Sequence, residues 1–500
     1  MPQRQPPESL SLRARLSRFL RQMGPGAIMA SLTIGSGELV FSSRAGSLFE
    51  FKVLGLFALV LALKWALVMG SAHHWLMSEK HPLERWTQLP GPSGWLPITL
   101  LLLAITAFPV WVSFHAGTIG TLLASITLST ATWNGAAPIV WGIGALLVCL
   151  VLSATGGYAR SEKIQSIIVA VMLGTVCLSL LFLRPDVMAM IRGLLYIGPL
   201  HYPEWATRLP EFSERPVWVE VANYAGVLGG GGYDYLAYIA WLREKHGERT
   251  DLARQDPAAL AELKRVVWVD SALSFVMVLA FTAVFVACGA ILLSPQHRVP
   301  AGTDLLTLQA QFVGGGVSWL RPIYFLGALL AMGGTLYGTI EVAPTLLRET
   351  LRALPCVPIT ADDPRIRRVS IAWCSLVALV LLTVNAWLVW RQPSTGGIKL
   401  VGLLTPANLF TGVMACGIIC LLNVWMDHRF LPREARLPLW LRALNLLSTL
   451  VFLGLGLKGY WELNKLLGPS LLLGTVALGC LAASQLKILV RRFDRPANPR

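Results

Sequence analysis

The chain has 500 residues, of which 55% are hydrophobic and only 14% charged, and its mean hydropathy is +0.60. Soluble globular domains carry about 25% charged residues, so the composition excludes an ordinary soluble protein and indicates a membrane protein. The net charge is +15, but the basic residues lie mainly in loops and tails and form no stripe interleaved with aromatic residues. We therefore expect no nucleic-acid partner.

Apolar segments long enough to cross a bilayer, which takes about 20 residues, recur along the whole chain. They lie near residues 22–42, 51–77, 97–126, 136–155, 162–183, 216–242, 266–293, 317–347, 369–390, 399–425, 439–457 and 467–490. None shows the strict alternation of barrel strands, which leaves helices as the spanning structure. The sequence thus predicts an all-α integral membrane protein with about twelve helices.

Most of the 42 Lys and Arg residues fall on one set of the loops that this topology creates, above all in residues 243–265 and 348–368. The positive-inside rule places such loops in the cytoplasm, together with both termini. The basic N-terminal stretch runs into a long apolar span interrupted by glycines and shows no cleavage site, so we expect no secretory signal. We expect a multi-pass protein of the plasma or inner membrane.

Two of the spans are interrupted by glycine-rich breaks. Residues 35–37 read Gly-Ser-Gly and precede Glu38, and residues 229–232 are four glycines, followed after one residue by Asp234. Each glycine costs a helix about 1 kcal/mol relative to alanine, so four in a row should interrupt it. Such breaks in corresponding helices of two halves predict an inverted-repeat transporter with a central site. The alternative is that these glycines only let helices pack closely.

Several motifs resemble those of the Nramp metal transporters. Residues 24–26 (Gly-Pro-Gly), 34–38 (Ile-Gly-Ser-Gly-Glu) and 44–46 (Arg-Ala-Gly) are similar to the first helix of that family. Residues 156–158 with 162–164 are similar to the start of its fifth helix, and residues 238–244 to the sixth helix of divergent relatives. The resemblance covers roughly residues 22–425.

This resemblance implies the LeuT-like fold of the APC superfamily, with two inverted five-helix repeats and two extra helices. The first repeat would occupy residues 22–183 and the second residues 216–425, separated by an external loop at 184–215. Two peripheral helices would follow at 426–490, and residues 1–21 and 491–500 would be cytoplasmic tails.

The chain departs from the family at the metal ligands. The first-helix motif Asp-Pro-Gly-Asn falls on residues 35–38, and the sixth-helix motif Met-Pro-His falls on residues 230–232, which are all glycine. Transition metals require nitrogen, sulfur or several carboxylate ligands, so manganese or iron bound in the usual way is not expected. The resemblance still implies a secondary transporter that works by alternating access on an inorganic divalent cation such as magnesium. The alternatives are a small organic solute, because a glycine-lined site would be roomy, and a non-transporting receptor.

The expected substrate site is formed by the two breaks and their acidic neighbours: Gly35, Ser36, Gly37, Glu38, Gly229, Gly230, Gly231, Gly232 and Asp234. Carboxylates within a membrane are costly, so Glu38 and Asp234 are candidates to bind a hard cation or to carry a coupling proton. Alternatively, Glu38 forms an ion pair with Lys64, and Asp234 caps the helix that follows the second break.

Three further residues are candidates for coupling or counter-charge. Lys64 lies midway along the second span and is a possible internal charge in the position of a cation. His115 is a candidate proton relay or a hydrogen-bonded packing residue. Glu341 faces either the pathway or the inner surface. We expect Asp270 to pair with Arg265 or its neighbours near the cytoplasmic end of its helix.

The chain shows no hydrolase, kinase or nucleotide-binding pattern, so we expect neither enzyme activity nor a cofactor. Its eight cysteines lie in or beside apolar segments, include no CxxC pair and are expected to be packing residues. The expected partners are the lipid bilayer, a small ion or solute as substrate, and a coupling proton or cation.

Overall fold

The computed structural model describes residues 24–35, 37–154, 158–183, 185–210, 212–213, 216–253, 256–299, 320–354, 363–392, 398, 406, 408–463 and 467–493. These ranges contain helices and no strands. Nine helical segments within them are long and apolar enough to cross a membrane. The prediction of an all-α, multi-pass membrane protein is confirmed. Of the three other expected spans, the one near residues 162–183 is a long helix, and those near residues 22–42 and 216–242 are helices with a break.

The first broken helix consists of α2 (Pro25–Thr33), the short π-helix η1 (Glu38–Ser42) and α3 (Ser43–Phe49). The chain leaves helical geometry at Ile34, whose φ of −80° and ψ of 94° are extended. The second broken helix consists of α11 (Val217–Val227) and α12 (Gly232–Ala253). Between them Gly229 and Gly230 have φ of 74° and 86°, a left-handed conformation that glycine adopts readily and other residues rarely adopt.

The remaining principal helices are continuous. They are α4 (Val53–Ser78), α6 (Trp95–Ile126), α7 (Ala137–Ala154), α8 (Tyr158–Leu183), α13 (Pro257–Cys288), α15 (Leu320–Ala353), α16 (Pro364–Arg391), α18 (Ala415–Phe430), α19 (Leu439–Leu463) and α20 (Leu467–Phe493). The π-helix η7 (Leu409–Met414) leads into α18, and α5 (Pro82–Trp86), α9 (Val187–Leu194) and α10 (Glu204–Thr207) are short.

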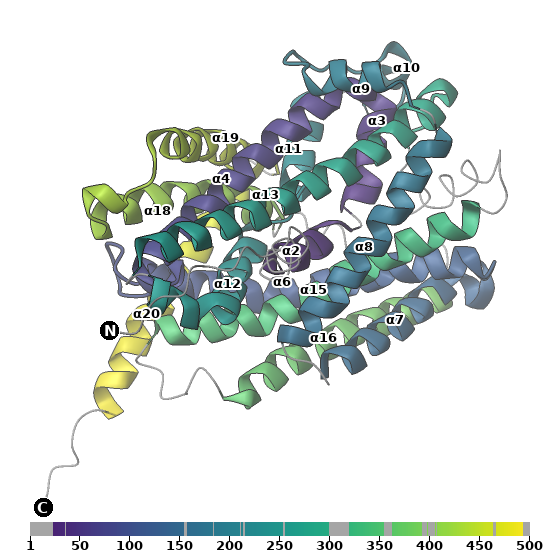
Figure 1. The fold of residues 1–500 in the computed structure, drawn as a ribbon. Coiled ribbons are helices and arrows are strands. Elements are labelled where there is room, and N and C mark those ends of the chain that lie inside the picture. Colours follow the sequence, from purple (N-terminus) through teal and green to yellow (C-terminus); the bar gives the residue numbers. More distant parts are fainter. Residues whose placement is uncertain are drawn as a thin grey trace, which may run out of the picture.

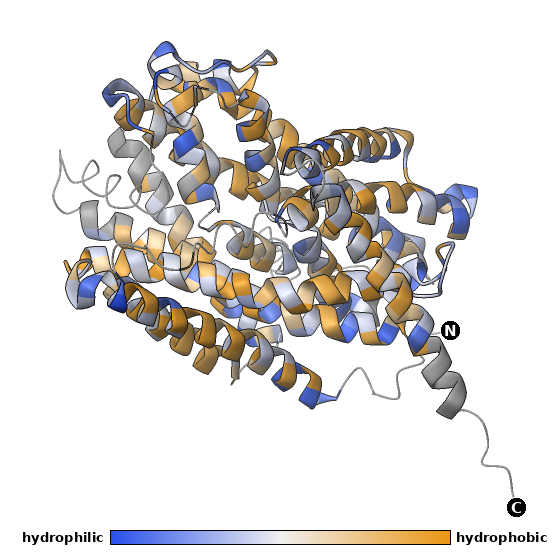
Figure 2. Cartoon of the chain, turned by 180° about the vertical axis from the view of Figure 1, so that it is seen from behind, coloured by the Kyte–Doolittle hydropathy of each residue, from blue (hydrophilic) through white to orange (hydrophobic). Residues whose placement is uncertain are grey.

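Helix α2 lies in the middle of the molecule, where it contacts α8, α12, α13 and α15 (Figure 1). Helices α7 and α16 lie side by side at the outside and carry mainly apolar residues (Figure 2). Three tryptophans of α16 (Trp373, Trp387 and Trp390) are about half exposed. A bilayer would cover this apolar surface, because exposed apolar surface of this extent is unfavourable in water.

A buried polar network fixes α19 against α4. Asn445 donates to the Ala66 carbonyl oxygen at 3.0 Å, and Ser448 donates to the Leu63 carbonyl oxygen at 3.1 Å. Asn423 of α18 donates both to Asn445 Oδ1 and to the Leu67 carbonyl oxygen. Helix α19, which the sequence placed at the periphery, is thus fastened to the part of α4 that carries Lys64.

Asp270 of α13 holds the beginning of α2. Its carboxylate accepts hydrogen bonds from the backbone N–H groups of Gly24 (3.0 Å) and Gly26 (2.7 Å) and from the hydroxyl of Tyr238 (3.1 Å). The expectation that Asp270 pairs with Arg265 or its neighbours is wrong, because its carboxylate binds these three groups instead. Residues five apart on an α-helix are also turned about 140° from one another. Asp270 instead caps another helix, which leaves fewer N–H groups without a partner in the protein interior.

We predict that Asp270→Ala lowers the free energy of unfolding by about 1.5 to 3 kcal/mol, because it removes a charged acceptor from two buried N–H groups. Thermal unfolding of the purified protein in detergent measures this loss. The control is Glu262→Gln, on the exposed side of the same helix, which should leave the unfolding temperature unchanged. Equal behaviour of the two variants would contradict the capping role.

Candidate functional site

The Glu38 carboxylate joins the two breaks. Its Oε2 accepts a hydrogen bond from the Gly35 N–H at 3.1 Å, and its Oε1 accepts one from the Gly229 N–H at 2.9 Å. The side chain is 1% exposed. Both N–H groups lie where a helix is interrupted and therefore lack the usual helical partner. One carboxylate thus satisfies a donor from each broken helix and sets the distance between the breaks.

Lys64 donates hydrogen bonds to carbonyl groups of the second break. Its Nζ donates to the carbonyl oxygens of Leu228 and Gly230, both at 2.7 Å. The side chain is fully buried, and its Nζ lies 6.0 Å from the centroid of the Phe452 ring of α19. Unpaired carbonyls are costly in a membrane interior, so the lysine stabilises the break that it contacts.

Lys64 and Glu38 bind opposite sides of the same break. Among the ion pairs of the described residues there is none between these two groups, so the alternative of a direct Lys64–Glu38 pair is not the arrangement found. Glu38 accepts from the Gly229 amide while Lys64 donates to the flanking carbonyls. Glu38 and Asp234 nevertheless bind amides of the same break whose carbonyls bind Lys64.

Asp234 caps α12, as one of the two interpretations of the sequence proposed. Its Oδ2 accepts from the Gly231 N–H at 2.7 Å, and the residue is partly buried. The next residue, Tyr235, donates its hydroxyl to the Gly229 carbonyl oxygen at 2.8 Å. Side chains from three elements, η1, α4 and α12, therefore satisfy the backbone of the second break.

The glycines of the breaks are packed against neighbouring helices. A side-chain carbon added at Gly35 would lie 2.0 Å from Thr335 Oγ1 of α15, and one added at Gly37 would lie 2.3 Å from Val227 Cγ1. At Gly231 it would lie 2.9 Å from the backbone of the helix leading into α18. The expectation of a roomy glycine-lined site is therefore wrong in this conformation. Ser36 lies outside the described residues.

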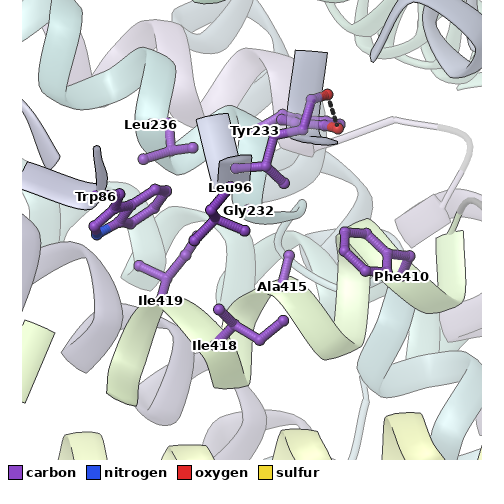
Figure 3. A pocket seen from close by; sticks show the side chains of 10 residues that line it. Trp86, Leu96, Gly232, Tyr233, Leu236, Phe410, Ala415, Ile418 and Ile419 are labelled. Atoms are coloured by element: carbon purple, nitrogen blue, oxygen red, sulfur yellow. Dashed lines mark hydrogen bonds between the residues drawn. The ribbon is translucent and has the colours of Figure 1, made fainter. Parts of the chain in front are cut away.

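Figure 3 shows a small cavity next to Gly232. Its volume is about 10 Å³, close to the minimum that holds one water molecule, and its lining is entirely apolar. The Tyr233 hydroxyl beside it donates to the Leu100 carbonyl oxygen at 2.6 Å. The other side chains at its wall are apolar, among them Trp86, Phe410 and Ile419. Such a cavity stays dry and offers no binding groups.

The donor groups at the breaks can be compared with the needs of a metal ion. Over the part of the chain that is described, no group of three or more His, Cys, Asp or Glu residues is placed to hold one. The acidic groups at the breaks are Glu38 and Asp234, and both accept hydrogen bonds from the backbone. The Leu228 and Gly230 carbonyls, which would extend an oxygen shell, bind Lys64.

Glu341 belongs to a different cluster. It forms an ion pair with Arg367 of α16 at 2.7 Å and accepts from the Ser153 hydroxyl. It lies on α15 six residues beyond Thr335, about 9 Å further along the helix axis. A cavity of about 180 Å³ between α8, α12, α15 and α16 reaches this pair. His115 lies on α6 with its ring edge-on to Phe114.

Two contacts that the sequence did not predict close the molecule on either side of the breaks. Arg44 of α3 forms a bidentate ion pair with Glu220 of α11 at 3.3 Å, and its guanidinium lies 5.0 Å from the Phe212 ring. On the other side, Lys245 of α12 forms an ion pair with Glu162 of α8 next to Gly24. The only signal in the sequence was the presence of Glu162 and Glu220 within apolar spans.

We predict that Gly229→Ala destabilises the protein by about 1 to 3 kcal/mol through its left-handed backbone alone. A further steric cost arises because the added carbon would lie 2.6 Å from Leu61. Thermal unfolding measures the loss. The matched control is Gly333→Ala in α15, where no atom lies within 4 Å of the added carbon, and which should stabilise the helix by up to about 1 kcal/mol. A neutral Gly229→Ala would contradict this geometry.

No family model and no curated protein matches the chain. Solved structures do. A manganese transporter from Eremococcus coleocola, in complex with an aromatic bis-isothiourea substituted compound, has a TM-score of 0.70 at 14% identity, over 97% of this chain and 98% of that one. A mutant of that transporter gives 0.68 at 15% identity over the same shares. MhsT in complex with L-phenylalanine gives 0.51 at 14% identity, over 87% and 97%. At these identities the likeness is one of fold, and it confirms the LeuT-like fold that the sequence motifs implied.

Proposed function

We propose that this chain is a secondary transporter that works by alternating access around the two breaks. The observation that carries the proposal is the meeting of two interrupted helices at one buried carboxylate, Glu38. Interrupted helices inside a membrane place backbone polar groups where a small ligand can exchange with them. The fold is shared with transporters of a metal ion and with MhsT, whose structure holds an amino acid.

Closure on the two sides of the breaks fits such a cycle. On one side of the breaks, the Arg44–Glu220 ion pair joins α3 of the first broken helix to α11 of the second. Asp270 and the Lys245–Glu162 pair hold α2 and α12 on the other. Opening one side alone would expose the breaks to that side of the membrane. Breaking a buried ion pair destabilises the protein strongly. Opening either side therefore needs water or ligand to replace the lost contact.

For the substrate we propose an inorganic divalent cation such as magnesium. Carboxylate oxygens are the ligands that magnesium prefers, and Glu38 and Asp234 are the carboxylates at the breaks. To bind the ion they would release the amides of Gly35, Gly229 and Gly231. Binding would then loosen the contacts between the broken helices, which couples the presence of substrate to movement.

A small organic solute is the second candidate, and one observation favours it. Lys64 already binds the carbonyl oxygens of Leu228 and Gly230, so these groups cannot complete an oxygen shell around a metal ion. A solute with its own polar groups needs fewer ligands from the backbone. The solute complexed with MhsT, L-phenylalanine, is of this class.

The decisive experiment measures magnesium flux into liposomes that contain the purified protein and an enclosed magnesium-sensitive dye. We predict saturable flux that falls at least about tenfold in Glu38→Gln and Asp234→Asn, which corresponds to about 1.4 kcal/mol of lost ion binding. The matched control is Glu50→Gln, at an exposed carboxylate after α3, which should retain the flux.

The other outcomes are equally informative. Unchanged flux in both site variants would remove the two carboxylates from the mechanism. Absence of flux, combined with thermal stabilisation by an organic solute and by no divalent ion, would establish the second candidate. A protein that neither transports nor is stabilised by any ion or solute would contradict the transporter proposal and favour the non-transporting receptor.

A further inference from the structure

The second break carries a built-in cation. We propose that the Lys64 side chain permanently occupies a cation position formed by the carbonyl oxygens of Leu228 and Gly230. The protein therefore does not bind a sodium or potassium ion there. This inference takes the proposed transporter as its frame, but the evidence for Lys64 and its test are independent of transport.

The position itself is one that attracts a cation. Helix α11 ends at Val227, and its C-terminal end carries the negative partial charge of the helix dipole. The extended Leu228 and the left-handed Gly229 and Gly230 interrupt the helical ladder there. In transporters with broken helices, unwound carbonyls and half-helix C-terminal ends coordinate sodium ions or protons. Here the Lys64 amine lies in that place.

The contacts of Lys64 fit a charged donor. Both of its hydrogen bonds to the break carbonyls are 2.7 Å, the short distance typical of bonds from an ionised donor. The Phe452 ring lies 6.0 Å from Nζ, within the range of a weak cation–π contact. The Asn445 and Ser448 bonds fasten α19, which carries this ring, to α4. The amine of Lys64 therefore lies between the second break and the Phe452 ring of α19.

The two carboxylates at the breaks favour a cation at the position of Lys64. Glu38 is 1% exposed and Asp234 is partly buried, and both carboxylates bind amides of the break that Lys64 contacts. Burying two carboxylates without a compensating cation is strongly unfavourable. Without the lysine, the site would hold two acidic groups, the Leu228 carbonyl would lose its side-chain donor, and the Gly230 carbonyl would keep only the Tyr235 hydroxyl at 3.4 Å. A neutral residue at position 64 should therefore create a vacancy that a small cation fills.

The test is thermal unfolding of purified wild-type protein and of Lys64→Ala, each in propylammonium chloride and in an equal concentration of tetramethylammonium chloride. Alanine removes the three outer carbons and the amine of lysine, a volume that propylammonium matches. We expect Lys64→Ala to unfold several degrees below wild type, and propylammonium to restore at least half of that loss with saturable dependence. Tetramethylammonium, which cannot donate hydrogen bonds, should restore none.

The matched control is Lys458→Ala. Lys458 is an exposed lysine of α19 whose Nζ lies 4.0 Å from the Trp218 ring centroid. Neither this variant nor the wild type should respond differently to the two salts. A Lys64→Ala protein that is as stable as wild type, or that propylammonium fails to restore, would overturn the proposal.

A second pair of variants decides the matter if Lys64→Ala does not fold in either salt. Lys64→Arg keeps the charge, whereas Lys64→Met keeps the length and apolar stem without it. The proposal predicts that the arginine variant unfolds at the higher temperature. A methionine variant of equal or greater stability would show that no cation is needed. Because these measurements involve no flux, failure of the transporter proposal leaves their outcome unaffected, and the reverse also holds.

Discussion

A single constraint organises the centre of this protein: backbone groups that two interrupted helices leave unpaired must find partners inside a membrane. Each such group costs several kcal/mol when buried alone. Glu38 accepts a hydrogen bond from one N–H of each break, and Lys64 donates to two carbonyls of the second. Asp234 accepts from the Gly231 N–H, and Tyr235 donates to the Gly229 carbonyl. Because these partners come from η1, α4 and α12, the breaks also fix how the helices pack around α2.

The same contacts make the centre responsive to a ligand. Glu38 and Asp234 are occupied by the backbone, so anything that binds them must displace an amide. Displacement would weaken the attachment between the two broken helices, which the Arg44–Glu220 pair and Asp270 otherwise support from either side. A ligand can shift a conformational equilibrium only by its differential affinity for the two states, and competition with backbone groups supplies such a difference.

The sequence predicted the elements well and the contacts between them poorly. The spans and both breaks follow from local properties, namely apolar length and consecutive glycines. The acidic neighbours Glu38 and Asp234 were found because a carboxylate is rare in an apolar span. The Arg44–Glu220 pair and the Asp270 cap join residues 176 and 244 or more positions apart. Nothing in a single sequence states which of many distant polar groups will meet.

Two expectations at the site show the limits in physical terms. The sequence left Lys64 either paired with Glu38 or standing as a counter-charge, and only the fold places its amine on the carbonyls of Leu228 and Gly230. The glycines were expected to leave space, yet Thr335 and Val227 fill it. Glycine weakens a helix, and it also lets neighbouring helices approach closely. A run of glycines in the sequence does not show which of these two effects applies.

Alternating access requires that the breaks become accessible from each side of the membrane in turn. Cys416 is fully buried and follows Ala415, which lies next to Gly232 at the second break, so it is a native reporter of that access. In a variant that keeps Cys416 as its only cysteine, sealed vesicles would be treated with a membrane-impermeant thiol reagent, applied outside or enclosed inside. Alternating access predicts labelling of Cys416 from both faces. Labelling from one face alone, or from neither, would contradict it.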